Sequence, residues 1–235
     1  MRDLLRFGRR NPIGLAAVPI GLVMIQPDFG TAMVLSLIVI TLLAVAGVSL
    51  RHLLVLALLA VTLVVAVVNV GLLQQYQVDR LTSFVSPNQD SRNTTYNTDQ
   101  SKNAIGNGGV TGRGFGNGSQ TAGGFVPEQH TDFIFTAVGE EFGFLGAAGL
   151  LALFAIVVWR TWRAALFARD FFGTLVSVGV LALFAFQIFV NMGMTMGIMP
   201  VTGIPLPFMS YGGSSAITGF ACVALVANVS MRRSR

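Results

Sequence analysis

Long apolar runs constrain the fold of this chain more than any other feature of its sequence. Most of them approach or exceed the roughly 20 residues with which a helix crosses a bilayer. Charged residues make up only 11% of the 235 residues, against about 25% in soluble domains. We therefore expect an all-α polytopic membrane protein with six transmembrane helices and one large external, glycine-rich loop. The runs cover residues 12–25, 30–48, 53–73, 133–158, 171–197 and 209–229.

Basic residues are distributed unevenly about these runs. With six crossings and the amino terminus inside, eleven arginines lie inside and only four basic residues lie outside, which favours cytoplasmic termini. The inner set is Arg2, Arg6, Arg9, Arg10, Arg51, Arg160, Arg163, Arg169, Arg232, Arg233 and Arg235, and the outer set is Arg80, Arg92, Lys102 and Arg113. The first run is short, so a re-entrant or interfacial segment is its alternative. The arginines form no stripe, so no nucleic-acid partner is expected.

The segment from residue 74 to residue 131 is the one large hydrophilic region. It divides the chain into three helices in residues 1–73, an external loop in 74–131, and three helices with a cytoplasmic tail in 132–235. Its glycine-dense part, residues 105–118, can form tight turns that bring N–H groups to an anion, or it can be a flexible linker. It matches neither nucleotide-binding fingerprint.

Asp132 lies where this polar segment meets the next apolar run. Loss of hydration at such a boundary favours proton uptake, which suits a carboxylate to accept a proton from a hydroxyl group. Glu140 and Glu141 lie deeper in the same run, where carboxylates usually face a cavity or a partner. The alternative for these two glutamates is a hydrogen-bonded pair that fixes helix packing.

Two further segments carry polar groups between apolar runs. Asp28 follows Pro27 and either caps the next helix or lines an outward-facing site. Residues 198–215 contain three prolines and three glycines, so they cannot form a continuous helix. Broken backbone at membrane depth is tolerated where protein buries it or where it lines a cavity. We expect this segment, which includes Ser210, on the same side as Asp132.

Four blocks of residues together resemble the SEDS family of bacterial membrane proteins, whose members include RodA and FtsW. They occur in family order at residues 26–31 (QPDFGT), 100–109 (QSKNAIGNGG), 125–143 (FVPEQHTDFIF with GEEFG) and 205–215 (PLPFMSYGGSS). The resemblance implies ten spans with a large outer loop after the seventh. Here the loop follows the third run, so the chain looks like spans five to ten, from a truncated reading frame or a fragment.

The resemblance also implies an activity and its residues. Family members are peptidoglycan glycosyltransferases of the bacterial cytoplasmic membrane that polymerise lipid II at its outer face, in elongation or division, with a class B penicillin-binding protein as partner. The family's catalytic aspartate corresponds to Asp132. The candidates for substrate binding are Lys102, Arg113, Glu128, His130, Asp28, Glu140 and Ser210. No metal-ligand cluster is visible, and a divalent cation on the diphosphate is possible as cofactor.

Two other functions stay open at this point. A lipid II flippase would place ionisable groups near the membrane midplane, whereas Asp28, Glu128 and Asp132 gather towards the outside. A truncated, non-catalytic scaffold of the cell-wall synthesis complex is the third alternative.

Overall fold

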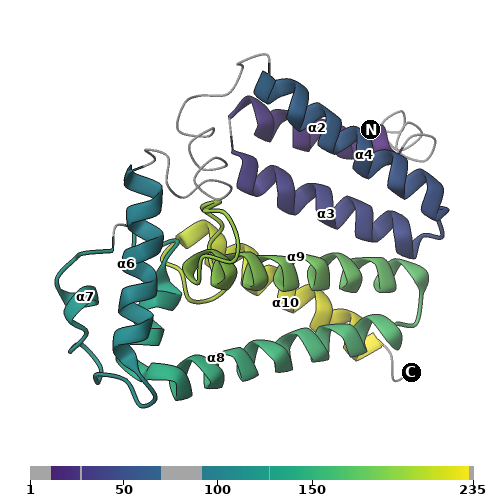
Figure 1. The fold of residues 1–235 in the computed structure, drawn as a ribbon. Helices are drawn as coiled ribbons and strands as arrows, with labels where there is room; N and C mark the ends of the chain where they lie inside the picture. Colours follow the sequence, from purple (N-terminus) through teal and green to yellow (C-terminus); the bar gives the residue numbers. More distant parts are fainter. Residues whose placement is uncertain (1–11, 27, 70–91, 127, 233–235) are drawn as a thin grey trace.

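The computed structural model describes residues 12–26, 28–69, 92–126 and 128–232 (Figure 1). The described residues are helical with irregular connections and contain no strand. The elements are α2 (Pro12–Ile25), α3 (Phe29–Val45), α4 (Leu50–Asn69), α6 (Arg92–Gly108), α7 (Ser119–Ala122), α8 (Ile134–Leu166), α9 (Phe171–Thr195) and α10 (Gly213–Met231). The amino-terminal arginines, Pro127 and residues 70–91 of the predicted loop lie outside the described residues.

All six apolar runs form helices close to their predicted positions. Three described helices, α8, α9 and α10, are long and apolar enough to cross a membrane, whereas α2, α3 and residues 50–59 of α4 are shorter apolar helices. The last helix begins at Gly213 rather than at residue 209, because the proline- and glycine-rich segment before it stays irregular. The polytopic, all-helical prediction is therefore confirmed.

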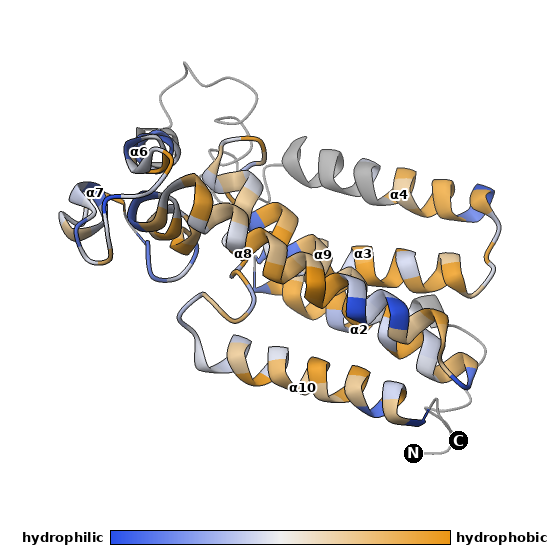
Figure 2. Ribbon diagram, turned by 90° about the horizontal axis from the view of Figure 1, so that it is seen from below, coloured by the Kyte–Doolittle hydropathy of each residue, from blue (hydrophilic) through white to orange (hydrophobic). Residues whose placement is uncertain are grey.

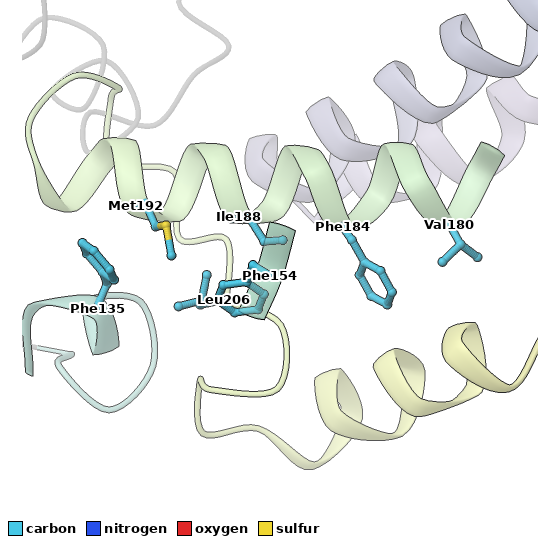
Figure 3. Packing of buried hydrophobic residues seen from close by; sticks show 7 residues of the cluster. All are labelled: Phe135, Phe154, Val180, Phe184, Ile188, Met192 and Leu206. Atoms are coloured by element: carbon cyan, nitrogen blue, oxygen red, sulfur yellow. The ribbon is translucent and has the colours of Figure 1, made fainter. Parts of the chain in front are cut away.

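Helix α9 is the centre of the bundle. In the apolar 18-residue stretch of each long helix, 44% of the residues are buried in α9, against 11% in α8 and in α10. Its lower face in Figure 3 carries four apolar side chains that meet residues from α8 and from the segment after α9. This core cluster consists of Phe135, Phe154, Val180, Phe184, Ile188, Met192 and Leu206. The packing fixes the carboxyl end of α9 against the start of α8.

The two ends of the molecule differ in polarity. Figure 1 places the α3–α4 connection, the α8–α9 connection and the carboxyl end of α10 together at one end, and α6 and α7 at the other. Helices α6 and α7 are largely hydrophilic, and the bundle helices are largely apolar (Figure 2). Five arginines lie in or next to the first end, namely Arg51, Arg160, Arg163, Arg169 and Arg232. This grouping agrees with the charge distribution that predicts the topology.

Helix α6 lies across α8 with almost no space between the two backbones. A Cβ atom on Gly108 would lie 2.0 Å from the carbonyl oxygen of Gly139. Near the same crossing, the buried Ser101 hydroxyl donates to the carbonyl of Thr195 in α9 at 2.9 Å and pairs with the Thr136 hydroxyl at 2.8 Å. The flexible-linker alternative for residues 105–118 is therefore wrong, since these glycines permit close packing.

Helix α8 is broken at Gly143, whose φ of 64° and ψ of −162° are not helical. The break exchanges four backbone hydrogen bonds with residues 109–114. Arg113 and Gly114 donate to the carbonyls of Glu140 and Glu141 at 3.0 and 2.9 Å, and Phe144 and Leu145 donate to the carbonyls of Gly109 and Val110 at 2.9 and 3.1 Å. An unpaired backbone group in an apolar environment costs several kcal/mol, so the glycine-rich loop stabilises the broken helix.

Candidate functional site

Residues 128–133 form a compact turn that delivers Asp132 to the start of α8. Glu128 has a φ of 50°, and its carbonyl oxygen accepts hydrogen bonds from the N–H groups of Thr131, Asp132 and Phe133 at 3.1 to 3.3 Å. Phe133 is buried, with 2% of its surface exposed, and packs with Ala104 of α6. Asp132 itself is half-buried, so the residue is only partly covered by the packed core.

Three consecutive carbonyl groups of this turn are bound by the carboxyl-terminal part of the chain. The carbonyl of His130 accepts the N–H of Tyr211 at 2.8 Å. The next carbonyl, that of Thr131, accepts the Ser210 hydroxyl at 2.5 Å, and the carbonyl of Asp132 accepts the Asn191 side-chain amide at 2.8 Å. The proline-rich segment thus lies beside Asp132, as the sequence predicts.

A cavity of about 520 Å³ lies between α7 and this turn. Its lining includes Glu128, Gln129 and His130 from the turn, with Thr121 and Ala122 from α7. Gln129 is buried, with 6% of its surface exposed. Its side-chain Nε2 is also buried and has no hydrogen-bond partner within the described residues. The cavity is therefore lined by a carboxylate, an amide and an imidazole residue that lie two to four positions before Asp132.

Glu140 binds within the protein rather than at this cavity. Its side chain is fully buried, and its Oε1 accepts from the N–H of Gln120 at 2.9 Å, from Asn107 at 3.2 Å and from the Ser119 hydroxyl at 3.3 Å. Its Oε2 accepts from the N–H and the hydroxyl of Thr121 at 2.7 and 2.5 Å. These five donors support the structural alternative for Glu140 and leave little capacity for a substrate.

The predicted cations have local partners. Lys102 lies 3.7 Å from Asp99, and its side chain lies over Gly197, just after α9. Arg113 donates to the carbonyl of Asn107 at 3.0 Å and also to its side-chain oxygen. Both cations are exposed. Arg113 therefore belongs to the group around Glu140, and Lys102 lies where α6 meets the end of α9.

Asp28 caps helix α3, as one of its two alternatives predicts. Its carboxylate accepts the N–H and the hydroxyl of Thr31 at 3.0 and 2.6 Å. The start of α3 nevertheless lies close to the proline-rich segment, because a Cβ on Gly30 would be 2.6 Å from the carbonyl of Thr202. Thr31 also lines a second cavity, of about 330 Å³, together with Pro205 and Pro207.

The pattern that defines the FtsW/RodA/SpoVE family, described as "Cell cycle protein", matches residues 5–235. The chain belongs to this family. It is 38% identical to stage V sporulation protein E of Bacillus subtilis over 209 residues, which cover 89% of the chain and 56% of that protein. It is 37% identical to the peptidoglycan glycosyltransferase MrdB of Escherichia coli over 222 residues, which cover 93% of the chain and 59% of that protein.

Solved structures give the same family assignment. A structure described as "Structural coordination of polymerization and crosslinking by a peptidoglycan synthase complex" matches with a TM-score of 0.77 and 34% identity, over 95% of this chain and 62% of that one. The crystal structure of the rod shape determining protein RodA of Thermus thermophilus matches with a TM-score of 0.61 and 30% identity, over 95% and 57%. The chain thus spans less than two thirds of the length of these FtsW/RodA/SpoVE relatives.

The fold of this FtsW/RodA/SpoVE chain gathers some predicted site residues and separates others. Glu128, His130, Asp132 and Ser210 lie together at the turn, whereas Glu140 and Arg113 belong to the break in α8. Within the described residues, no group of three or more His, Cys, Asp or Glu side chains could hold a metal ion. A divalent cation on the diphosphate stays a prediction.

Sequence reasoning missed Asn191, Tyr211 and Gln129 as parts of this site. Asn191 carries a detectable signal, because it is one of two amides, with Gln187, in a largely apolar run, and such polar groups in membrane helices usually have a bonding role. Tyr211 acts through its backbone and Gln129 through burial, and neither property is visible in the sequence.

Proposed function

We propose that the protein is a peptidoglycan glycosyltransferase that polymerises lipid II at the outer face of the bacterial cytoplasmic membrane, with Asp132 as general base. The acceptor is the 4-hydroxyl of a GlcNAc residue, and the donor sugar is α-linked to pyrophosphate. A single in-line displacement gives the β-1,4 linkage with inversion. Pyrophosphate is a good leaving group, so one carboxylate suffices, unlike the pair required for glycoside hydrolysis.

The observation that carries this proposal is that the turn of residues 128–133 is fixed by hydrogen bonds and lies beside an open cavity. Asp132 is half-buried and its main chain is fixed, which suits a base that must meet a hydroxyl in one geometry. His130 and Gln129 line the adjacent cavity, and the imidazole of His130 is suited to bind sugar hydroxyls or the diphosphate. A positioned general base contributes roughly 10²- to 10⁴-fold to the rate.

A class B penicillin-binding protein is the proposed partner. The support is the similarity to the peptidoglycan synthase complex, whose description couples polymerization with crosslinking. The proposed orientation places the arginine-rich end of the bundle in the cytoplasm and the α6–α7 end outside, following the preference of basic residues for the inner side.

The proposal is tested with purified lipid II and protein in liposomes. We would compare the chain itself with a chimera in which it replaces the matching region of E. coli MrdB. Asp132→Asn should lower polymerisation at least 100-fold in whichever form is active. The matched control is Asp170→Asn, because Asp170 caps α9 through the N–H of Gly173 and asparagine caps equally well. It should retain activity within about twofold.

Three results would count against the proposal. Normal polymerisation by Asp132→Asn would remove Asp132 from the chemistry. Movement of lipid II between leaflets, without polymer formation by the chain or by the chimera, would favour the flippase instead. Absence of both activities from the chain and the chimera would favour a scaffold.

A further inference from the structure

We propose that Asn191 and Ser210 are positioning residues that hold the main chain of Asp132 and thereby fix the Cα–Cβ direction from which its carboxylate projects. The inference rests on the proposed role of Asp132 as general base. Neither side chain needs to touch the substrate. Both act on the peptide groups from which the aspartate projects.

The direction of the Cα–Cβ bond follows from the backbone dihedrals of the residue, φ and ψ, and the carboxylate then takes one of a few staggered rotamers about that bond. These two angles are set by the orientation of the peptide planes on either side of the Cα atom, since each peptide group is itself planar. A residue whose two flanking planes are both held therefore projects its Cβ in one direction. An unheld plane lets that direction vary with the motion of the turn.

Both planes around Asp132 are held at both of their polar ends. In the preceding plane, the Thr131 carbonyl accepts the Ser210 hydroxyl at 2.5 Å, and the Asp132 N–H donates to the carbonyl of Glu128 at 3.1 Å. In the following plane, the Asp132 carbonyl accepts the Asn191 amide at 2.8 Å, and the Phe133 N–H donates to the same Glu128 carbonyl at 3.3 Å. The turn supplies one partner for each plane, and the distant part of the chain supplies the other.

The two external partners are themselves anchored. Asn191 is fully buried in α9, and its amide also donates to the carbonyl of Ile204 at 2.8 Å. The hydroxyl of Ser210 accepts the N–H of Leu206 at 2.7 Å. Each residue thus connects the Asp132 turn to the segment after α9 through hydrogen bonds. One of the two residues, Asn191, belongs to α9, the most buried of the long helices.

Loss of the hydrogen bonds made by either residue should affect the chemical step more than substrate binding. Misplacement of a catalytic group by about 1 Å can lower a rate about 100-fold. We expect Asn191→Leu, which keeps the approximate shape but removes both donors, to lower kcat by roughly 10- to 100-fold. Ser210→Ala removes one donor and should lower kcat less. The KM for lipid II should change less than about threefold, because a positioning role leaves uniform binding intact.

The test measures kcat and KM per folded protein in the active form, with Ser177→Ala as the matched control. Ser177 is also fully buried in α9, and its hydroxyl has no hydrogen-bond partner within the described residues. This control should keep kcat and KM. A double variant then separates positioning from general damage: in an Asp132→Asn background, Asn191→Leu should cause no further loss of rate.

Three results overturn the positioning role. Asn191→Leu could leave kcat per folded molecule unchanged and lower only the folded fraction. It could instead raise KM while keeping kcat. It could also reduce the residual rate of Asp132→Asn by the same factor as that of the unaltered protein. Normal activity of Asp132→Asn alone would refute the general base itself, so the two failures are distinguishable.

Discussion

Replacing Glu140 with glutamine should loosen the α7 region while leaving the bundle folded. The carboxylate accepts five hydrogen bonds, two of them from the backbone N–H groups of Gln120 and Thr121. A glutamine keeps only one acceptor oxygen and turns an NH₂ group towards donors. The hydroxyls of Ser119 and Thr121 can rotate to accept from that NH₂ group, but a backbone N–H cannot.

The size of the effect follows from this inventory. With the amide nitrogen at the Oε2 position, the N–H of Thr121 loses its acceptor and the remaining bonds lose the charge. Hydrogen bonds to charged groups contribute about 1.5–3 kcal/mol each. Part of that loss is offset because a neutral amide is cheaper to bury. We therefore expect a local destabilisation of roughly 2–4 kcal/mol.

Amide hydrogen exchange measures this quantity at the residues concerned. A local loss of 2–4 kcal/mol corresponds to exchange that is roughly 30- to 900-fold faster, provided that opening is local. The matched control is Glu141→Gln, because Glu141 is only half-buried and no side-chain hydrogen bond of Glu141 occurs within the described residues. Unchanged exchange at Gln120 and Thr121 in Glu140→Gln, or equally fast exchange in both variants, would refute the reasoning.

Three further predictions concern stability in detergent, followed as thermal unfolding. Gly112→Ala should destabilise the protein by more than about 2 kcal/mol, because its φ is +82° and a Cβ would lie 2.1 Å from the carbonyl oxygen of Glu141. Gly106→Ala should stabilise it by about 0.5–1 kcal/mol, since nothing lies within 4 Å of the added Cβ in α6; a lower melting temperature for this variant would contradict the packing. Asp28→Ala should cost about 1 kcal/mol through loss of the α3 cap, whereas Asp28→Asn should cost almost nothing. Equal melting temperatures for the two Asp28 variants would show that the cap does not contribute.

The apolar helices could be predicted from sequence because hydrophobic length determines them directly. Helix α6 could not be predicted in the same way. Its sequence is polar and contains Gly106 and Gly108, which individually disfavour a helix. Its helical form depends on packing across α8, at Gly108 against Gly139, and on the Ser101 hydroxyl that bonds to α9. Those contacts join residues far apart in the chain.

The candidate site, too, could be predicted from the sequence only in part. The position of Asp132 at a polar boundary follows from the residues beside it. Its supports do not, because Asn191 and Ser210 lie 59 and 79 residues from the groups that they bind. The partners of Glu140 could not be predicted for a related reason: two of its donors are backbone N–H groups of α7, and backbone groups carry no signature in the residue type.

The shared backbone bonds at Gly143 couple residues 109–114 rigidly to helix α8. Moving residues 109–114 away would leave four backbone groups of a membrane helix without hydrogen-bond partners at once. A partial displacement would therefore be no more favourable than a complete one. The loop should therefore stay closed under forces that move ordinary surface loops, and it should release only together with that end of the helix. A protein that pulls on this loop would transmit its force directly into the bundle.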